Sequence, residues 1–172
     1  EERQSVVADS HPAGDEKFSQ AYTELNIEKA NKWLDEIGME VGSDGWRTLP
    51  NGESFTLVLS PGGTKNARVH AASILAEQFK NHLEINALNK PQERSLWVER
   101  AHAGKHMMPV YANSNGARAW SDPGPYFPTE FSCYWAPLNG RYYSTDGEGG
   151  IKHEGNVQTL IDIWDEISVT TD

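Results

Sequence analysis

The sequence predicts an α/β fold of mixed α+β character, and three observations predict it. An apolar, β-branched run at residues 54–60, "SFTLVLS", ends at a Pro-Gly-Gly turn and is typical of a buried strand. Two further short apolar runs, "LEINAL" at 83–88 and "MMPVYA" at 107–112, alternate with stretches of helical spacing. Strands that alternate with helices favour a parallel sheet with right-handed crossovers and helices packed on its faces.

The first helix is expected from about residue 28 to residue 37. Asn26 or a neighbour can cap its start, and Gly38 ends it. Its apolar residues recur at i, i+3, i+4 and i+7 and so share one face: Ala30, Trp33, Leu34 and Ile37. The next segment, "VGSDGWRTLPNG", is rich in glycine and contains a proline, and we expect a loop there.

Two more helices are expected to connect the three strands. Residues 68–82 and the residue that follows place apolar side chains at helical spacing: Ala72, Leu75, Ala76, Phe79 and Leu83. Residues 92–104, "QERSLWVERAHAG", repeat the helical pattern before the third strand. In a sheet of this kind ligands are favoured near the carboxyl ends of the strands.

The two ends of the chain differ from this middle part. Residues 1–25 carry no strong period, and we expect an extended lead-in followed by one domain at 26–172. Residues 113–150 are dense in glycine, proline and aromatic side chains, which predicts a long ordered loop region with a hairpin turn at Asn139–Gly140. A last helix is expected with Asn156 as its cap and an apolar stripe: Val157, Leu160, Ile161, Trp164 and Ile167.

Composition narrows the classes of partner. The 172 residues suit one hydrophobic core, and the net charge of −10 repels phosphate backbones and anionic membrane surfaces. Nucleic acid is therefore not expected as a partner. No stretch approaches the roughly 18 apolar residues of a membrane span, and no signal sequence opens the chain at Glu1, so we expect a soluble, mature or truncated chain.

Candidate chemical motifs are weak. Glu99, His102 and His106 are spaced to share one helical face, but Gly104 disfavours a helix there and the catalytic zinc motif is absent. Solvated histidines at a helix end are the favoured interpretation. The segment "SPGGTKN" lacks P-loop spacing, no Gly-x-Ser-x-Gly occurs, and the single Cys133 is expected to be a small buried packing residue. We expect no catalytic residues, no metal ligands, no cofactor and no enzymatic activity.

Aromatic side chains crowd into residues 120–143, which favours stacking on a sugar ring or a peptide side chain. Polar residues beside them could orient such a ligand. The alternative is that most of these rings fill the protein's own core. The expected ligand-binding residues are Trp120, Asn113, Asn115, Arg118, Asp122, Trp135 and Tyr142.

The ordered series of segments resembles a known family. "AYTELNIEKANKWLDEIGM" followed by "DGWRTLPNGESFTLVL", and then "VHAASILAEQF" and "QERSLWVERAHAGKHMM", is similar to extracellular solute-binding proteins of family 5. That family includes dipeptide, oligopeptide, nickel and oligosaccharide binders, and the resemblance covers roughly residues 1–135. It implies a single lobe of a type II periplasmic-binding-protein fold, similar to domain 3 of dipeptide-binding proteins.

The resemblance also implies a function. Such proteins are substrate-binding components of ABC importers, which capture an extracytoplasmic solute and deliver it to a membrane permease. The expected location is periplasmic, or lipid-anchored at the outer face of the cytoplasmic membrane, in a bacterium or archaeon. The chain would then be a fragment of a larger bilobal protein, without the first lobe and without the lipid anchor.

One position bears on the ligand of such a receptor. Peptide-binding members resemble one another in an aspartate that pairs with the peptide's amino terminus, and this chain has Ala119 there. A buried unpaired ammonium is costly, so an oligosaccharide is favoured over an oligopeptide. The alternatives that stay open are an oligopeptide-specific receptor and a non-transport interaction module with an exposed apolar patch. An enzyme is a further class, and its only candidate residues are Glu99, His102 and His106.

Overall fold

The computed structural model describes residues 14–64, 67–111 and 123–170. Within these ranges the chain forms two compact units. The first, here called the sheet unit, comprises described residues within 22–97 and 106–112. The second, here called the helical unit, comprises described residues within 1–21, 98–105 and 113–172.

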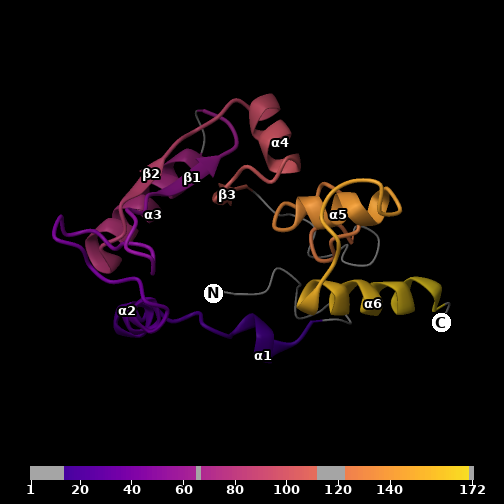
Figure 1. Ribbon diagram of the computed structural model, residues 1–172, viewed down its shortest axis with the longest axis horizontal. Coiled ribbons are helices and arrows are strands. Elements are labelled where there is room, and N and C mark those ends of the chain that lie inside the picture. The colour runs from indigo at the N-terminus through magenta and orange to yellow at the C-terminus, as the bar shows by residue number, and fades with distance from the viewer. Residues whose placement is uncertain (1–13, 65–66, 112–122, 171–172) are drawn as a thin grey trace. The chain divides into compact units, whose positions relative to one another are not determined.

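The sheet unit is built on a parallel sheet, as the sequence predicts. Strand β1 (Leu57–Pro61) lies between β2 (Ala87–Asn89) and β3 (Met108–Val110) and runs parallel to both (Figure 1). In the register, Leu59 pairs with Asn89 on one side and with Met108 on the other. Helix α3 (Ala67–Leu83) connects β1 to β2, and α4 (Arg94–His102) connects β2 to β3.

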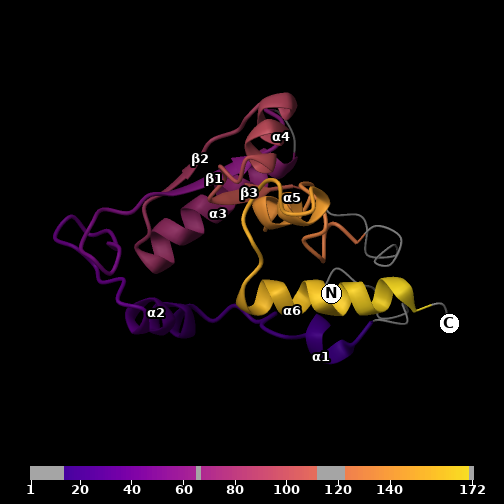
Figure 2. The same ribbon diagram turned by 45° about the vertical axis from the view of Figure 1, so that its right-hand side comes forward.

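The core of the sheet unit lies between α3 and the strands. Ala72 and Ala76 are one helical turn apart and buried, and they pack with the buried Leu59 and Ala87 of the sheet. Small side chains on the inner face of α3 let the helix approach the sheet closely, while Phe79 and other larger residues pack around them. Figures 1 and 2 both show α3 running beside the strands.

Helix α2 (Ile27–Glu36) begins and ends where its sequence predicts. The Asn26 side-chain oxygen accepts a hydrogen bond from the Lys29 backbone N–H at 2.9 Å, which satisfies one free donor of the first turn. Gly38 follows the helix with φ of 82°, a left-handed conformation that glycine adopts without a Cβ penalty. The cap prediction for Asn26 is confirmed.

Arg47 joins three separate parts of the sheet unit. Its side chain is only 4% exposed, and its guanidinium donates to Asp35 Oδ1 at 2.6 Å, to Asn31 Oδ1 at 2.9 Å, and to the Met39 carbonyl. Its Nε donates to the Leu83 carbonyl at 2.9 Å, at the last residue of α3. One buried cation therefore connects α2, the segment after it and the end of α3.

The helical unit contains α1 (Glu16–Ser19), α5 (Pro137–Ser144), α6 (Gly155–Val169) and the last part of α4. The apolar stripe expected on the last helix is confirmed, because its five residues are buried or half-buried. Ile161 is buried, and the Trp164 ring lies 5.3 Å from that of Phe127. No helix among the described residues is both long and apolar enough to cross a membrane.

Three local predictions for this unit are wrong. Asn156 does not cap α6, which begins after Glu154 in extended conformation and without a side-chain cap bond. A short helix, α1, lies in the segment expected to be extended. Residues Asn139 and Gly140 form no hairpin, because they lie inside α5.

The physical reason for Gly140 is close packing. A Cβ built on Gly140 would lie 2.0 Å from the carbonyl oxygen of Glu130, a distance no side chain can occupy. Pro137 stands at the start of α5, where proline is favoured in a helix. Gly140 thus permits α5 to approach the Glu130 backbone closely, and the Asn-Gly pair makes no turn.

We expect Arg47→Ala to destabilise the sheet unit by about 3 kcal/mol, because it leaves buried carbonyls and the Asn31 amide without their donor. Urea unfolding followed by circular dichroism measures the change. Arg100→Ala, at an exposed position of α4, is the matched control and should shift stability by less than about 0.5 kcal/mol. Equal effects of the two substitutions would contradict the role of the Arg47 network.

Candidate functional site

The carboxyl ends of β1 and β3 meet at one edge of the sheet, with Gly62 and Tyr111 directly after them. The Gly62 backbone N–H donates to the Val110 carbonyl at 3.3 Å, which continues the pairing of the two strands. A Cβ on Gly62 would lie 3.0 Å from the Tyr111 ring and 3.2 Å from the Trp97 ring. Glycine at this position therefore lets two aromatic rings pack directly on the backbone.

Three rings form a stack at this edge, here called the ring column: Tyr111, Trp97 and His106. Trp97 is fully buried, and its Nε1–H donates to the Ser60 carbonyl at 2.7 Å. The Tyr111 ring stacks on Trp97 with centroids 4.5 Å apart, and the His106 ring stacks at 5.3 Å. His106 Nε2 lies 3.0 Å from the Trp97 carbonyl, which acts only as an acceptor, so Nε2 carries the proton.

Two arginines border the ring column. The guanidinium carbon of Arg68 lies 4.5 Å from the Tyr111 ring centroid, and that of Arg94 lies 5.7 Å from it. Arg68 donates to the Gly62 carbonyl at 2.9 Å, and Arg94 donates to the Tyr111 hydroxyl. We call these two residues the basic rim. An ordered aromatic surface that is flanked by charged hydrogen-bond donors is suited to binding a polar solute.

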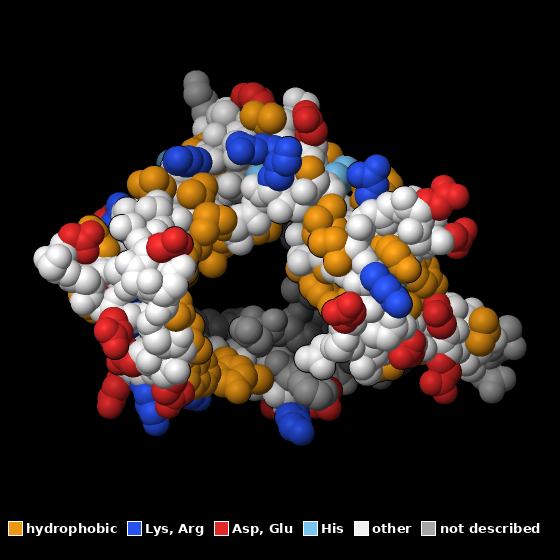
Figure 3. All heavy atoms as spheres, in the orientation of Figure 1, with side chains coloured by type: hydrophobic (Ala, Val, Ile, Leu, Met, Phe, Trp, Pro, Cys, Tyr) orange, Lys and Arg blue, Asp and Glu red, His pale blue; other side chains and the backbone are white. Residues whose placement is uncertain are grey.

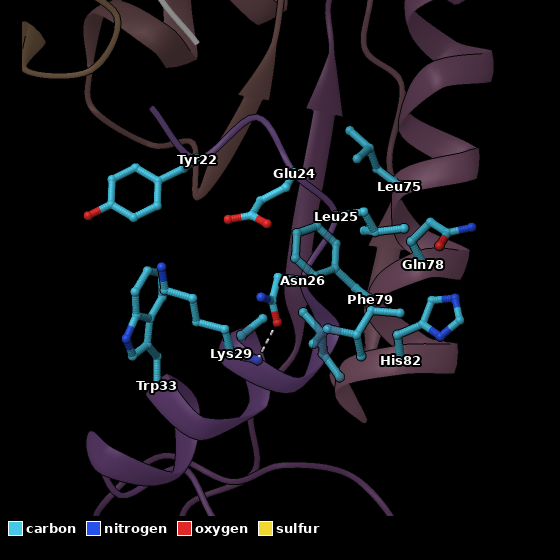
Figure 4. Close-up of a pocket in the computed structure, with 13 residues that line it drawn as sticks. Tyr22, Glu24, Leu25, Asn26, Lys29, Trp33, Leu75, Gln78, Phe79 and His82 are labelled. Carbon is cyan, nitrogen blue, oxygen red and sulfur yellow. Dashed lines mark hydrogen bonds between the residues drawn. The ribbon is translucent and has the colours of Figure 1, made fainter. Parts of the chain in front are cut away.

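A separate apolar pocket of about 300 Å³ lies between α2 and α3. Figure 4 shows Tyr22 and Trp33 on one side of it and Leu75 and Phe79, from α3, on the other. The Lys29 ammonium lies 4.9 Å from the ring centroids of both Tyr22 and Trp33. Because α3 starts at the carboxyl edge of the sheet, its second half and this pocket lie away from that edge. We therefore take the carboxyl edge as the candidate ligand site.

Most of the ligand residues predicted from the sequence lie outside the described residues: Asn113, Asn115, Arg118, Trp120 and Asp122, together with Ala119. Trp135 and Tyr142 lie in the helical unit. Trp135 is 52% exposed and donates from Nε1 to the Pro125 carbonyl at 3.2 Å. Tyr142 packs edge-on against the buried His153, with centroids 5.2 Å apart. Their role in ligand binding stays a prediction.

Sequence reasoning missed the four residues of the carboxyl edge that carry rings or charge: Arg68, Arg94, Trp97 and Tyr111. Arg68 and Arg94 stand at or near the first residue of their helices, where each reads as an ordinary solvated side chain. The signal that could have identified them was their position, since each follows a predicted strand and so belongs to the edge where ligands bind.

The two histidines considered as metal ligands are part of aromatic packing. The His102 ring meets Phe131 edge-on at 4.6 Å, and burial lowers the pKa of His102 from its ordinary value. Both histidines are half-buried, so the expectation of solvated side chains is wrong. Within the described ranges, no three metal-binding side chains come together.

The single cysteine packs in the helical unit. Cys133 is fully buried, and burial raises the pKa of its thiol to about 11. The prediction of a small buried packing residue is confirmed.

Comparison with known proteins identifies relatives. The family model described as bacterial extracellular solute-binding proteins, family 5 Middle, matches residues 1–137. Oligopeptide-binding protein OppA has a similar structure over 99% of the chain, with a TM-score of 0.85 and 25% sequence identity. Among curated protein sequences, none matches this chain significantly.

Two structures of a periplasmic oligopeptide-binding protein from Thermotoga maritima are also similar over 87% of the chain. The first has a TM-score of 0.58 and 22% identity, and the second, bound to mannohexaose, has a TM-score of 0.57 and 23% identity. The chain spans 29% of OppA and 26% of each Thermotoga structure. The expected fold, a fragment of a periplasmic-binding-protein fold, is confirmed.

We expect Cys133 to react slowly with a thiol reagent such as DTNB at pH 8 while the chain is folded. A raised pKa keeps the sulfur protonated at this pH, and full burial blocks access to it. The measurement is the rate of absorbance change with and without denaturing urea, which should raise the rate at least a hundredfold. A fast reaction of the folded chain would show that the helical unit opens around Cys133.

Proposed function

Because the chain belongs to family 5 of the bacterial extracellular solute-binding proteins, we propose that it is part of the substrate-binding component of an ABC importer. This component captures an oligosaccharide or oligopeptide outside the cytoplasm and delivers it to a membrane permease. The match of the family model over residues 1–137 is the observation that carries the proposal. The structural similarity to OppA over 99% of the chain supports it.

The similar structures support two ligand classes, oligopeptides and oligosaccharides. OppA and the Thermotoga protein are named as oligopeptide binders, and one Thermotoga structure holds mannohexaose. For this chain we propose an oligosaccharide first, because Ala119 cannot supply a countercharge for a peptide's amino terminus. An oligopeptide-specific receptor is the alternative.

The proposed site is the carboxyl edge of the sheet unit, and Trp120 is a ligand contact predicted from the sequence alone. The chain contributes part of a cleft, and a further lobe of a larger bilobal protein closes over the ligand by a hinge motion. The protein lies either in the periplasm or at the outer face of the cytoplasmic membrane, where a lipid anchor holds it. Enclosure by both lobes supplies most of the burial of a ligand, so this chain alone binds weakly.

The proposed role is capture and release without chemistry. The sequence suggests one candidate set of acid–base side chains: Glu99, His102 and His106. His102 and His106 pack on aromatic rings in the structure, and the family match to solute-binding proteins supports a binding role. We therefore propose that the protein is not an enzyme.

One observation favours a second candidate function, a non-transport interaction module. The pocket between α2 and α3 exposes apolar side chains, with Leu25 85% exposed and Trp33 46% exposed. Exposed apolar surface of this kind marks contact with another protein segment. A missing lobe of the same protein would equally cover it.

We expect manno- or cello-oligosaccharides at millimolar concentration to raise the melting temperature of the full-length bilobal protein, since a ligand that binds only the folded state stabilises it. Trp120→Ala should abolish the shift, because it removes the proposed stacking surface. The measurement is a thermal shift assay against oligosaccharides and di- to pentapeptides. Trp33→Ala, in the pocket between α2 and α3, is the control and should retain the shift.

The possible outcomes separate the candidates. A shift with peptides alone would replace the oligosaccharide receptor by the oligopeptide receptor and refute the argument from Ala119. No shift with either class would contradict the receptor function and favour the interaction module.

A further inference from the structure

The pocket between α2 and α3 has the volume and the lining of a small-molecule site. Its volume is about 300 Å³, and its wall on the α3 side is apolar, with Leu75, Phe79 and Leu83. This volume lies at the lower end of the range for ligand sites and suits a molecule of roughly ten to fifteen non-hydrogen atoms. All of its lining residues belong to the sheet unit.

Apolar side chains at this pocket are exposed to solvent in the described part of the chain. Tyr22 is 67% exposed and Leu75 is 41% exposed. Figure 3 shows hydrophobic side chains on the surface in the left part of the view, where Figure 1 places α2 and α3. The apolar body of a ligand would remove part of this surface from water, which is favourable.

One cation, Lys29, lies among these apolar side chains. Its ammonium lies 4.9 Å from the ring centroids of both Tyr22 and Trp33, and Figure 4 shows the side chain extending toward these two rings. Lys29 is half-buried, and no carboxylate within residues 14–64, 67–111 and 123–170 forms an ion pair with it. Aromatic faces attract an ammonium but leave its N–H donors available to an anion.

The other charges at the pocket leave this positive potential in place. The N-terminus of α2 contributes Asn26 and Ile27 to the lining, and the helix dipole is positive at that end. Glu24 is the only carboxylate among the residues that line the pocket, and it is exposed, so water screens its charge. His82 also lines the pocket and is either neutral or positive. The half-buried ammonium of Lys29 therefore determines the sign of the charge inside.

Both sides of the pocket are ordered without a ligand. Phe79 packs against the buried core of the sheet unit. Asn26 caps α2, and the Tyr22 and Trp33 rings meet edge to face with centroids 5.8 Å apart. Tyr22 has a φ of 56°, a left-handed conformation that costs free energy for tyrosine and is often found at ligand sites. A pocket that is already ordered loses less conformational entropy on binding.

From these observations we propose that this pocket binds a small amphipathic carboxylate. Its apolar or aromatic body lies against α3, and its carboxylate lies at the Lys29 ammonium. A medium-chain fatty acid and an arylalkanoic acid both have this chemistry. Charge complementarity favours such a ligand over a protein segment with a purely apolar surface, which would leave the half-buried ammonium unpaired. The pocket is separate from the carboxyl edge, so this inference does not rest on the proposed function.

The test uses the full-length protein and three probes that share one apolar body. 4-Phenylbutyrate, 4-phenylbutanamide and 4-phenylbutylamine differ in the head group, which is anionic, neutral or cationic at neutral pH. Ligand-observed NMR titration at low salt measures dissociation constants in the millimolar range. We expect 4-phenylbutyrate to bind roughly tenfold more tightly than the amide, and we expect the amine to bind most weakly.

Three variants locate the charge and the apolar wall. Lys29→Gln should weaken binding of 4-phenylbutyrate roughly tenfold and change binding of the amide by less than about twofold. Lys32→Gln removes the same charge from an exposed position of the same helix and should leave all three constants unchanged. Leu75→Asp places a carboxylate in the apolar wall and should abolish binding of both 4-phenylbutyrate and the amide. Circular dichroism shows whether each variant is folded.

The outcomes decide between the occupants. Preference for 4-phenylbutyrate that is lost in Lys29→Gln and retained in Lys32→Gln supports the carboxylate site. Equal binding of the three probes, tightest binding of the amine, or equal loss in the two lysine variants would overturn it. Absence of binding for every probe would also overturn it and would favour a protein segment as the occupant. None of these outcomes depends on a solute at the carboxyl edge.

Discussion

The hydrogen bond from the Trp97 indole to the Ser60 carbonyl fixes the geometry of the whole carboxyl edge. Both groups are buried, so each would be left without a partner if the bond were lost, which is costly in a low-dielectric interior. The bond ties α4 to the end of β1. Tyr111 and His106 then stack on the indole, and through Tyr111 the two arginines take their places. Removal of this one contact would disturb the sheet, the helix and the rim together.

Much of the sheet unit could be predicted from the sequence because its signals are local. The period of Ala72 and Ala76 gives the inner face of α3, and Asn26 caps α2 with its own side chain. Arg47 could not be predicted in the same way. It stands in a glycine-rich loop, where arginine is normally solvated, and its burial depends on acceptors at residues 31, 35, 39 and 83.

In the helical unit, local sequence signals predict less of the structure. The Asn139–Gly140 pair is a strong local turn signal, but both residues lie inside α5, where Gly140 packs against the Glu130 carbonyl. The sequence predicts that aromatic residues contact the ligand. At the carboxyl edge, however, the aromatic rings pack beneath the guanidinium groups of Arg68 and Arg94. No sequence motif marks Arg68 and Arg94. The two side chains come together only in the folded structure, so their separation along the chain gives no signal.

Gly62 has a consequence for how this protein can change over time. Two rings occupy the space where any larger side chain would project, so this position and the ring column restrict one another. Arg94, by contrast, is exposed and can be replaced without repacking the interior. Among related sequences, substitutions should therefore be more frequent at exposed positions such as Arg94 than at Gly62 and in the ring column. New ligand preferences could then arise by single substitutions at little cost to folding.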